Sequence, residues 1–139
     1  MSIKTRVDDA LFLYDNGRHE GAFLNALLAV AASAKKAFPD LTGDRDRFER
    51  FLEGHWRGVT TIEFRGECHT IPRILYKWFR CELVHEGGLP VDIELIDTDK
   101  MSLRAGGAPY YTLQLSRGWF NWLIQAVVQD PCNADEFRP

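Results

Sequence analysis

The stretch RHEGAFLNALLAVAASAKKAFP, residues 18–39, is apolar around more than half of a helix circumference. Five alanines between Ala22 and Ala32 would let neighbouring helices approach closely. Lys35 and Lys36 suit the last turn, where the helix dipole favours cations, and a proline closes the pattern. We therefore expect this helix to be the central and most buried one.

Other stretches also place apolar residues at helical spacing: 3–16, 41–56, 69–88 and 116–130. Their ends carry capping signals. A helix start is expected at Thr42 or Asp44, at Thr70 and at Ser116. Helix stops are expected at Asn16-Gly17, at Gly87-Gly88 and before Pro131, and Gly54 and Gly58 weaken the end of the third helix.

Strand signals are fewer. Residues 58–67 have β-branched residues and predict a loop or a short strand, whereas 91–99 alternate apolar and acidic residues like an exposed strand. Residues 100–115 offer a Gly-Gly turn and a second strand-like run, and the tail from 131 reads as irregular. We predict a mainly all-α fold, an up-down bundle of about five helices with a small β-hairpin between the last two, in one domain over 1–139.

Composition limits the function classes. A length of 139 residues fits one domain that folds alone, and a net charge of −3 lacks the basic balance typical of nucleic-acid binding. The three cysteines are an odd number at unrelated spacings, which favours reduced thiols. The N-terminal residues have no apolar signal core, and the longest apolar run is too short to span a bilayer. These features predict a cytoplasmic protein without membrane contact.

Arg80 and His85 lie five positions apart at the end of the fourth predicted helix. A guanidinium that grips a phosphate and an imidazole that moves a proton are the minimum for cleaving RNA without metal. The RNA supplies its own nucleophile, the 2′-OH. Since one histidine can hardly act as both base and acid in one step, a symmetric partner would supply a second copy.

The spacing alone does not choose this pair, because Arg50 and His55 repeat it. His85 as an inert helix-end histidine, and Arg80 as a salt-bridge partner of Glu82 or Glu86, remain alternatives. The remaining candidate residues are better explained by structural roles. Cys68-His69 lack further zinc ligands at regular spacing, and Trp119 with Trp122 suit a core or dimer interface better than a base-stacking platform.

RCELVHEG at the end of an aromatic-rich helix, the alanine-rich second helix and the final GWFNWLIQAVV together resemble the HEPN superfamily of all-helical domains. Arg80 and His85 match the arginine and histidine of that family's signature. Cys81 stands where the family more often has a polar residue that orients the histidine, and Glu82 and Glu86 flank the motif as supporting residues.

The resemblance implies a metal-independent endoribonuclease that needs no cofactor and works as a homodimer on single-stranded RNA, often as a toxin or defence effector. An antitoxin or regulatory protein is a possible partner. Gly87 stands where HEPN toxins paired with a nucleotidyltransferase antitoxin carry a tyrosine, which disfavours that pairing. Two alternatives stay open: a catalytically silent HEPN module for dimerisation or partner binding, and a nucleotide-binding module with Arg80 as its phosphate contact.

Overall fold

The computed structural model describes residues 2–56, 60–89, 92–96, 98, 100–106 and 112–138. The helices are α1 (Ile3–Asp15), α2 (His19–Ala37), α3 (Asp44–Glu53), α4 (Ile71–Ile74), α5 (Cys81–Glu86), α6 (Arg117–Gln129) and α7 (Ala134–Phe137), with a π-helical segment η1 (Leu75–Arg80) and a 3-10 turn η2 (Pro131–Asn133). The strands are β1 (Thr61–Phe64), β2 (Glu67–Thr70), β3 (Ile93–Ile96), β4 (Leu103–Gly106) and β5 (Thr112–Ser116).

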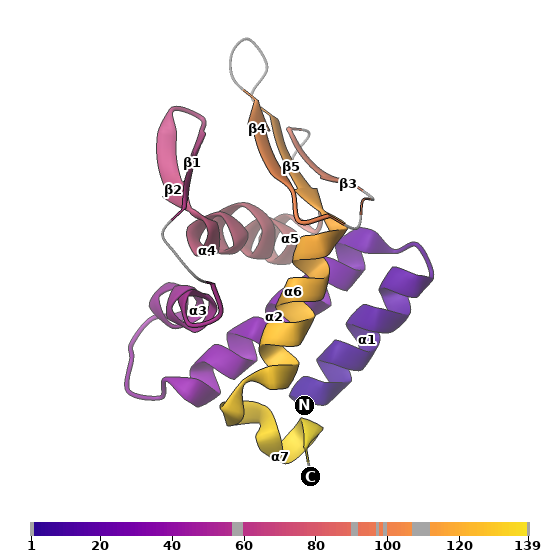
Figure 1. Cartoon of the computed structure of the whole chain (residues 1–139), viewed down its shortest axis with the longest axis vertical. Coiled ribbons are helices and arrows are strands. Elements are labelled where there is room, and N and C mark those ends of the chain that lie inside the picture. Colours follow the sequence, from indigo (N-terminus) through magenta and orange to yellow (C-terminus); the bar gives the residue numbers. More distant parts are fainter. Residues whose placement is uncertain are drawn as a thin grey trace.

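Helix α2 is the centre of the helical part, as predicted. It packs against α1, α3 and α6, and its small residues let these neighbours approach closely. Its buried positions recur at helical spacing: Ala22, Phe23, Ala26, Leu27, Ala29, Val30, Ser33 and Ala34. Figure 1 shows α2 running between α1 and α3, with both chain ends at the opposite end of the molecule from the sheets.

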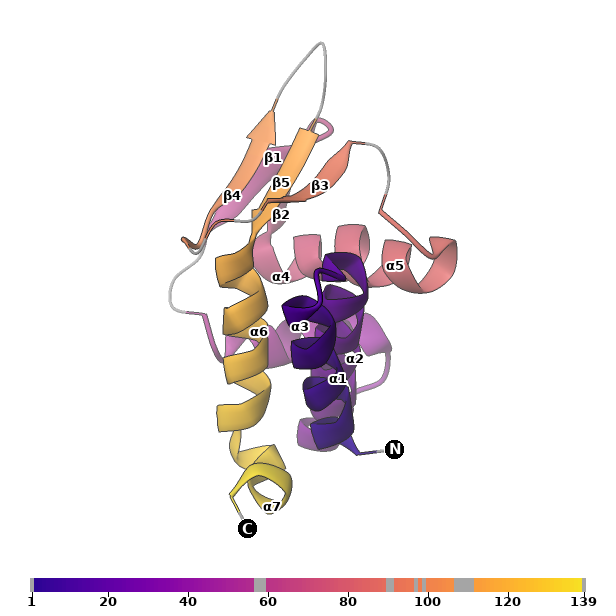
Figure 2. The same cartoon turned by 90° about the vertical axis from the view of Figure 1, so that its right-hand side faces the viewer.

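The prediction of a mainly all-α bundle with one hairpin is wrong. The described residues contain five strands in two small sheets, so the fold is mixed α/β. Both sheets lie at one end of the molecule, above the helix that runs from α4 to α5 (Figure 2). Strand pairing joins residues that are distant in the sequence, and a linear pattern of apolar residues does not reveal such partners.

The first sheet is a hairpin of β1 and β2, in the region predicted as a loop or one short strand. The strands pair antiparallel from Thr61 opposite Thr70 to Phe64 opposite Glu67. Arg65 and Gly66 form the turn, both with positive φ (53° and 79°). Two positive φ values match the right-handed twist of a two-residue hairpin, at a cost for arginine that glycine does not have.

The second sheet has three strands in the order β3-β5-β4. The sequence predicted only a two-stranded hairpin between residues 91 and 115. β3 lies parallel to β5, and β4 pairs antiparallel with the other edge of β5. Of the strand predicted over 91–99, positions Val91, Asp97 and Asp99 lie outside the described residues. Gly107 of the predicted turn does too, as does Gly58 at the weakened end of the third helix.

The predicted helix over 69–88 is present as α4, η1 and α5 in succession. Thr70 caps it as predicted, since its hydroxyl accepts a hydrogen bond from the Arg73 amide at 3.3 Å. Gly87 ends it with a φ of 75°, the left-handed conformation that favours glycine. The π-helical turn was not predicted, and the Cys81 amide that donates to the Tyr76 carbonyl belongs to it.

The predicted cap of α3 is wrong, whereas that of α6 is correct in position but makes no side-chain hydrogen bond to the helix. Gly43, rather than Thr42 or Asp44, precedes α3, and it makes no side-chain cap. Ser116 does precede α6, but its hydroxyl donates to the Lys100 carbonyl and accepts from the Ser102 amide at 2.7 Å. The hydroxyl therefore joins the start of α6 to the segment before β4 instead of capping the helix.

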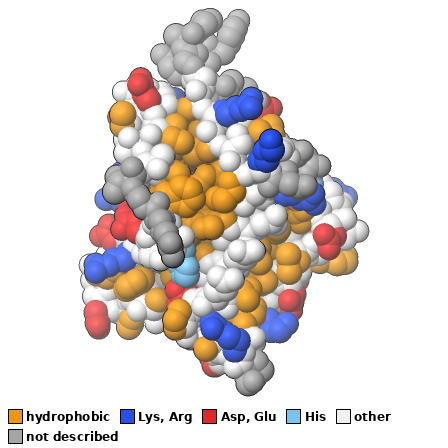
Figure 3. Space-filling view, viewed as in Figure 1, with side chains coloured by type: hydrophobic (Ala, Val, Ile, Leu, Met, Phe, Trp, Pro, Cys, Tyr) orange, Lys and Arg blue, Asp and Glu red, His pale blue; other side chains and the backbone are white. Residues whose placement is uncertain are grey.

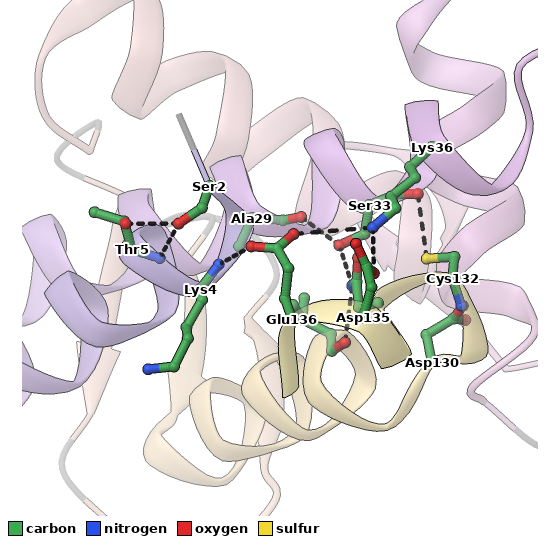
Figure 4. Close-up of polar contacts among 12 residues, drawn as sticks. Ser2, Lys4, Thr5, Ala29, Ser33, Lys36, Asp130, Cys132, Asp135 and Glu136 are labelled. Carbon is green, nitrogen blue, oxygen red and sulfur yellow. Dashed lines mark hydrogen bonds and ion pairs between the residues drawn. The ribbon is translucent and has the colours of Figure 1, made fainter. Parts of the chain in front are cut away.

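The tail predicted as irregular forms η2 and α7, which dock on the other helices. Figure 4 shows how the acidic residues of α7 reach α1 and α2. Glu136 Oε1 accepts from the Lys4 amide at 3.0 Å, and Asp135 Oδ1 lies 2.7 Å from Lys36 Nζ. These contacts close the helical part at the end opposite the sheets.

Apolar side chains are also visible on the outside, between the β1–β2 hairpin and the three-stranded sheet (Figure 3). Half-buried Ile62 and Leu103 of these elements pack against the core. No helix in the described ranges is long and apolar enough to cross a membrane.

Candidate functional site

Arg80 is the last residue of η1, and its side chain lies over the ring of Tyr76, one turn earlier. The guanidinium carbon is 5.3 Å from the ring centroid. Its Nε is buried and has no hydrogen-bond partner among the described residues. Nor does Arg80 pair with Glu82, Glu86 or any other carboxylate in the described part of the chain. Among the described residues, the guanidinium therefore has no ion-pair partner.

Arg80 lines a pocket of about 180 Å³ between α2, α3 and η1. The lining residues are Ala31, Ala32, Lys35, Asp44, Arg47, Tyr76 and Arg80. Three of these are cations and one is a carboxylate. The excess of cations over carboxylates in the lining makes the pocket suited to a small anion.

The other charged groups of the pocket differ in how firmly they are held. Arg47 Nε donates to the Leu41 carbonyl at 2.7 Å, and its NH1 lies 3.7 Å from Asp44 Oδ1. Lys35 is exposed, with no hydrogen bond or ion pair to a described residue. Arg47 is thus fixed and partly neutralised, whereas Lys35 is free to turn toward a ligand.

Tyr76 and Cys81 meet beside this pocket. Burial, followed by the nearby Cys81 thiol, raises the pKa of the Tyr76 hydroxyl above its usual value. The phenol therefore keeps its proton at neutral pH and stays a potential donor. Cys81 is half-buried and contacts the tyrosine, which gives this non-polar replacement a packing role.

His85 lies in α5, is exposed, and does not line the Arg80 pocket. It makes no hydrogen bond, ion pair or ring contact with any residue that the structure describes. Leu83 points into the core, while Val84 is 42% exposed beside the histidine. Figure 2 shows the end of α5 projecting past α1 and α2 at the side of the molecule.

Within one chain, Arg80 and His85 therefore share a helix but not a pocket. The residues between them, Cys81 to Val84, are α-helical, and five α-helical steps turn the two side chains about 140° apart around the axis. The predicted supporting residues Glu82 and Glu86 do not bridge the two. A site using both residues needs a substrate that spans the distance, or a second chain.

The competing pair, Arg50 and His55, is engaged in the structure. His55 Nε2 lies 2.7 Å from Asp130 Oδ2, and the Trp122 indole donates to the His55 carbonyl at 3.2 Å. Arg50 lies over the ring of Phe38 at 5.7 Å. These contacts tie α3 to α6 and α2, which assigns the second match to packing.

The other candidates also have structural roles. Cys68 is exposed on β2 and His69 is 6% exposed on its opposite face, so the two cannot share a metal. No group of three metal-ligating side chains occurs among the described residues. Trp119 is buried, and Trp122 packs edge-on against it.

Sequence reasoning missed Lys35, Arg47 and Tyr76 as neighbours of Arg80. Tyr76 could have been found, because it lies four residues before Arg80 on a predicted helix. Lys35 was noted only for the helix dipole. Arg47 carried no signal, since its approach depends on how α3 packs against α2.

Comparison with known proteins gives one match. The Rv1289 family matches residues 2–139, nearly the whole chain. Neither the curated proteins nor the solved structures contain a match. A functional argument therefore has to start from the residues themselves, and on the family match the chain belongs to the Rv1289 family.

Proposed function

We propose that this protein is an endoribonuclease that cleaves single-stranded RNA without metal, as a homodimer in the cytoplasm. The observation that carries the proposal is the contrast between two matching pairs. His55 is held by Asp130, whereas His85 has no hydrogen bond or ion pair with a described residue. Both arginines lie over aromatic rings without an ion pair among the described residues, but only Arg80 has a buried Nε without a hydrogen-bond partner there. A role in toxicity or defence, and a HEPN relationship, belong to the same proposal.

The chemistry follows from the two side chains. Arg80 holds the non-bridging oxygens of the phosphodiester and stabilises the charge that grows on them. A histidine base removes the proton of the 2′-OH, whose oxygen attacks the phosphorus. The bond to the 5′-oxygen breaks, and that oxygen takes a proton from a histidine acid. The products are a 2′,3′-cyclic phosphate end and a 5′-hydroxyl end.

A homodimer would bring together Arg80 and His85, which do not share a pocket within one chain. A two-fold axis near the projecting end of α5 would bring His85 of each chain toward the Arg80 pocket of the other. Exposed Val84 beside the histidine provides apolar surface for such a contact. Because the fold is mixed α/β, the proposal depends on these residues and not on likeness to an all-helical domain.

The test uses labelled single-stranded RNA with EDTA present. Arg80→Ala and His85→Ala are expected to abolish cleavage, while Arg50→Ala, the matched arginine of the competing pair, keeps it. The product is checked for a 2′,3′-cyclic phosphate. Equal cleavage by all of these proteins would remove the assignment of Arg80 and His85, and loss of wild-type cleavage in EDTA would remove the metal-free mechanism.

Mixing inactive variants tests the shared site. Equal amounts of Arg80→Ala and His85→Ala chains form heterodimers in about half of the dimers, and each heterodimer has one intact site if arginine and histidine come from different chains. This intact pair lacks the second His85 of the base–acid pair, so recovery of at most about a quarter of the wild-type activity is expected. Any recovery would show that Arg80 and His85 of one site come from different chains, whereas no recovery would mean that a site needs both copies of His85 or takes both residues from one chain.

A catalytically silent module for dimerisation or partner binding, such as a regulatory protein or antitoxin, is the second candidate. Its supporting observation is that His85 does not line the pocket of Arg80. This candidate predicts a folded protein that leaves RNA intact. Gain of RNA cleavage on Cys81→Asn would support this second candidate, because the polar residue that is usual in HEPN domains would then restore a lost activity.

A further inference from the structure

We infer that the pocket between α2, α3 and η1 binds a single phosphoryl group, held by Lys35, Arg47 and Arg80. The inference deepens the proposed function, on which it rests for RNA as the source of that group. It adds Lys35, Arg47 and Tyr76 to the residues that contact the ligand.

The charge balance of the pocket favours an anion. Lys35, Arg47 and Arg80 face it, and Asp44 is the one carboxylate in the lining. Asp44 is 68% exposed at its side chain and pairs only loosely with Arg47, at 3.7 Å. Two cations therefore remain without a carboxylate among the described residues, which a bound dianion would balance.

The geometry of Arg80 is that of a residue prepared for a ligand. The guanidinium carbon lies over the Tyr76 ring, 5.3 Å from its centroid, and this contact restricts the side chain before a ligand binds. The Nε is sealed from solvent and has no hydrogen-bond partner among the described residues, so it is not the atom that a ligand in the pocket would reach. The outer guanidinium nitrogens of this lining residue are the available donors, and a planar guanidinium can offer a phosphoryl group two parallel hydrogen bonds.

The size of the pocket selects the group. Sites for whole small molecules usually measure roughly 300–1,000 Å³. The volume here is about 180 Å³, which accommodates a phosphoryl group but leaves the sugar and base of a nucleotide outside. The ligand is then a phosphate carried by a larger molecule, such as the end or the backbone of an RNA strand.

Tyr76 also lines the pocket. A phenol is protonated at neutral pH, and burial with the Cys81 thiol raises the pKa of Tyr76 further, against the opposing effect of Arg80. A neutral phenol beside a phosphoryl group avoids the repulsion that a phenolate would cause. Ala31 and Ala32 leave the space that larger side chains would fill.

The experiment titrates the full chain, labelled with ¹⁵N, with inorganic phosphate at constant ionic strength. The Arg80 Nε–Hε signal, assigned with the Arg80→Gln variant, is expected to shift in a saturable way. Lys35→Gln and Arg80→Gln should each weaken phosphate binding by about tenfold or more. Lys36→Gln is the matched control: it removes the same charge at the next position, where the lysine pairs with Asp135 instead.

Equal phosphate affinity in all variants, or no saturable shift at Arg80, would overturn the inference. His85→Ala should bind phosphate like the wild type, since His85 does not line the pocket. Phosphate binding without RNA cleavage would therefore support the phosphoryl site and contradict the nuclease proposal. RNA cleavage without saturable phosphate binding would support the nuclease proposal and contradict the phosphoryl site.

Two oligoribonucleotides then identify the source of the group. They share one sequence, carry a 2′-O-methyl at every position to prevent cleavage, and differ only in a 5′-phosphate or a 5′-hydroxyl. Tighter binding of the phosphorylated strand, lost in Lys35→Gln, identifies strand ends. Equal binding of both strands, lost in the same variant, identifies backbone phosphates. Binding of both that survives Lys35→Gln and Arg80→Gln would contradict a role for the pocket in RNA recognition.

Discussion

His55 Nε2 lies 2.7 Å from Asp130 Oδ2, which connects the second residue after α3 to the residue after α6. Both side chains are mostly buried, with 22% and 18% of their surfaces exposed. The same carboxylate accepts from the Cys132 amide at 2.9 Å through its other oxygen. One aspartate thus fixes the end of α3 and the start of η2 together.

Replacing Asp130 by Asn should destabilise the fold by about 1–2 kcal/mol, because the amide loses the charge that both donors use. Urea unfolding followed by circular dichroism measures the change. Asp135→Asn, at an exposed ion pair with Lys36, is the control and should cost less than about 0.5 kcal/mol. An effect at Asp130 no larger than at Asp135 would show that the His55 contact contributes little.

The pH dependence of that difference has a defined sign. Burial alone would raise the pKa of Asp130, but hydrogen bonds from Cys132 and His55 outweigh it and lower the pKa below the usual value. The charged form is therefore favoured by folding, and its contribution is present above the unfolded pKa of about 3.9. The stability gap between wild type and Asp130→Asn should be constant from about pH 7 to pH 5 and shrink below about pH 4. A gap that widens on acidification would contradict this assignment.

Cys132 should resist alkylation in the folded protein. Burial and the neighbouring Asp130 raise the pKa of its thiol to about 12, and the thiolate is the reactive form. With iodoacetamide at pH 8, exposed Cys68 should be modified first and Cys132 last, as peptide mass spectrometry can show. Modification of all three cysteines in urea is the control. Equal rates for Cys68 and Cys132 in the folded state would be inconsistent with the buried environment.

The helices could be predicted because their signals are local. The apolar face of α2 and the stop at Gly87 depend only on residues within a few turns. The sheets could not be predicted, since β3 pairs in parallel with β5 although β4 lies between them in the sequence. In the first hairpin, exposed Glu67 and Cys68 break the alternation that marks a strand, and Arg65 occupies a turn position that usually favours glycine or asparagine.

The same distinction applies to the candidate site. Arg80 was identified from its place at a helix end, and its neighbour Tyr76 lies one turn away on the same helix. Lys35 and Arg47 reach the pocket only because α2, α3 and η1 pack together. The angle between Arg80 and His85 follows from their spacing of five on a helix, whereas the π-helical turn before Arg80 has no sequence signature and could not be predicted.

Gly118 is expected to be the least replaceable helical glycine among the described residues. A Cβ there would lie 2.7 Å from the Met101 amide nitrogen and 2.8 Å from the Lys100 carbonyl carbon, both backbone atoms. Gly118→Ala should therefore destabilise the fold by about 1–3 kcal/mol. Gly21→Ala is the matched control, because its Cβ would meet only the end of Leu13 at 3.4 Å. That change in the first turn of α2 should be neutral or stabilise by up to about 1 kcal/mol, and a Gly118→Ala protein as stable as Gly21→Ala would contradict the close approach.

Asn133 is fully buried and connects η2 to two helices at once. Its Nδ2 donates to Ser33 Oγ at 2.8 Å and to the Val127 carbonyl at 2.9 Å. Asn133→Ala removes the Nδ2 hydrogen bonds to Ser33 and to the Val127 carbonyl. We therefore expect the free energy of unfolding to fall by about 2–3 kcal/mol.

Ser33→Ala should cost less than Asn133→Ala, since Asn133 keeps its contact with Val127 and the serine hydroxyl otherwise bonds only within α2, to Ala29 at 2.7 Å. Urea unfolding of both single variants and the double variant measures the coupling, which should exceed about 0.5 kcal/mol for side chains in direct contact. Additive single effects would mean that Asn133 acts through Val127 alone. A loss in Asn133→Ala below about 0.5 kcal/mol would mean that the docking of the C-terminal segment does not depend on this residue.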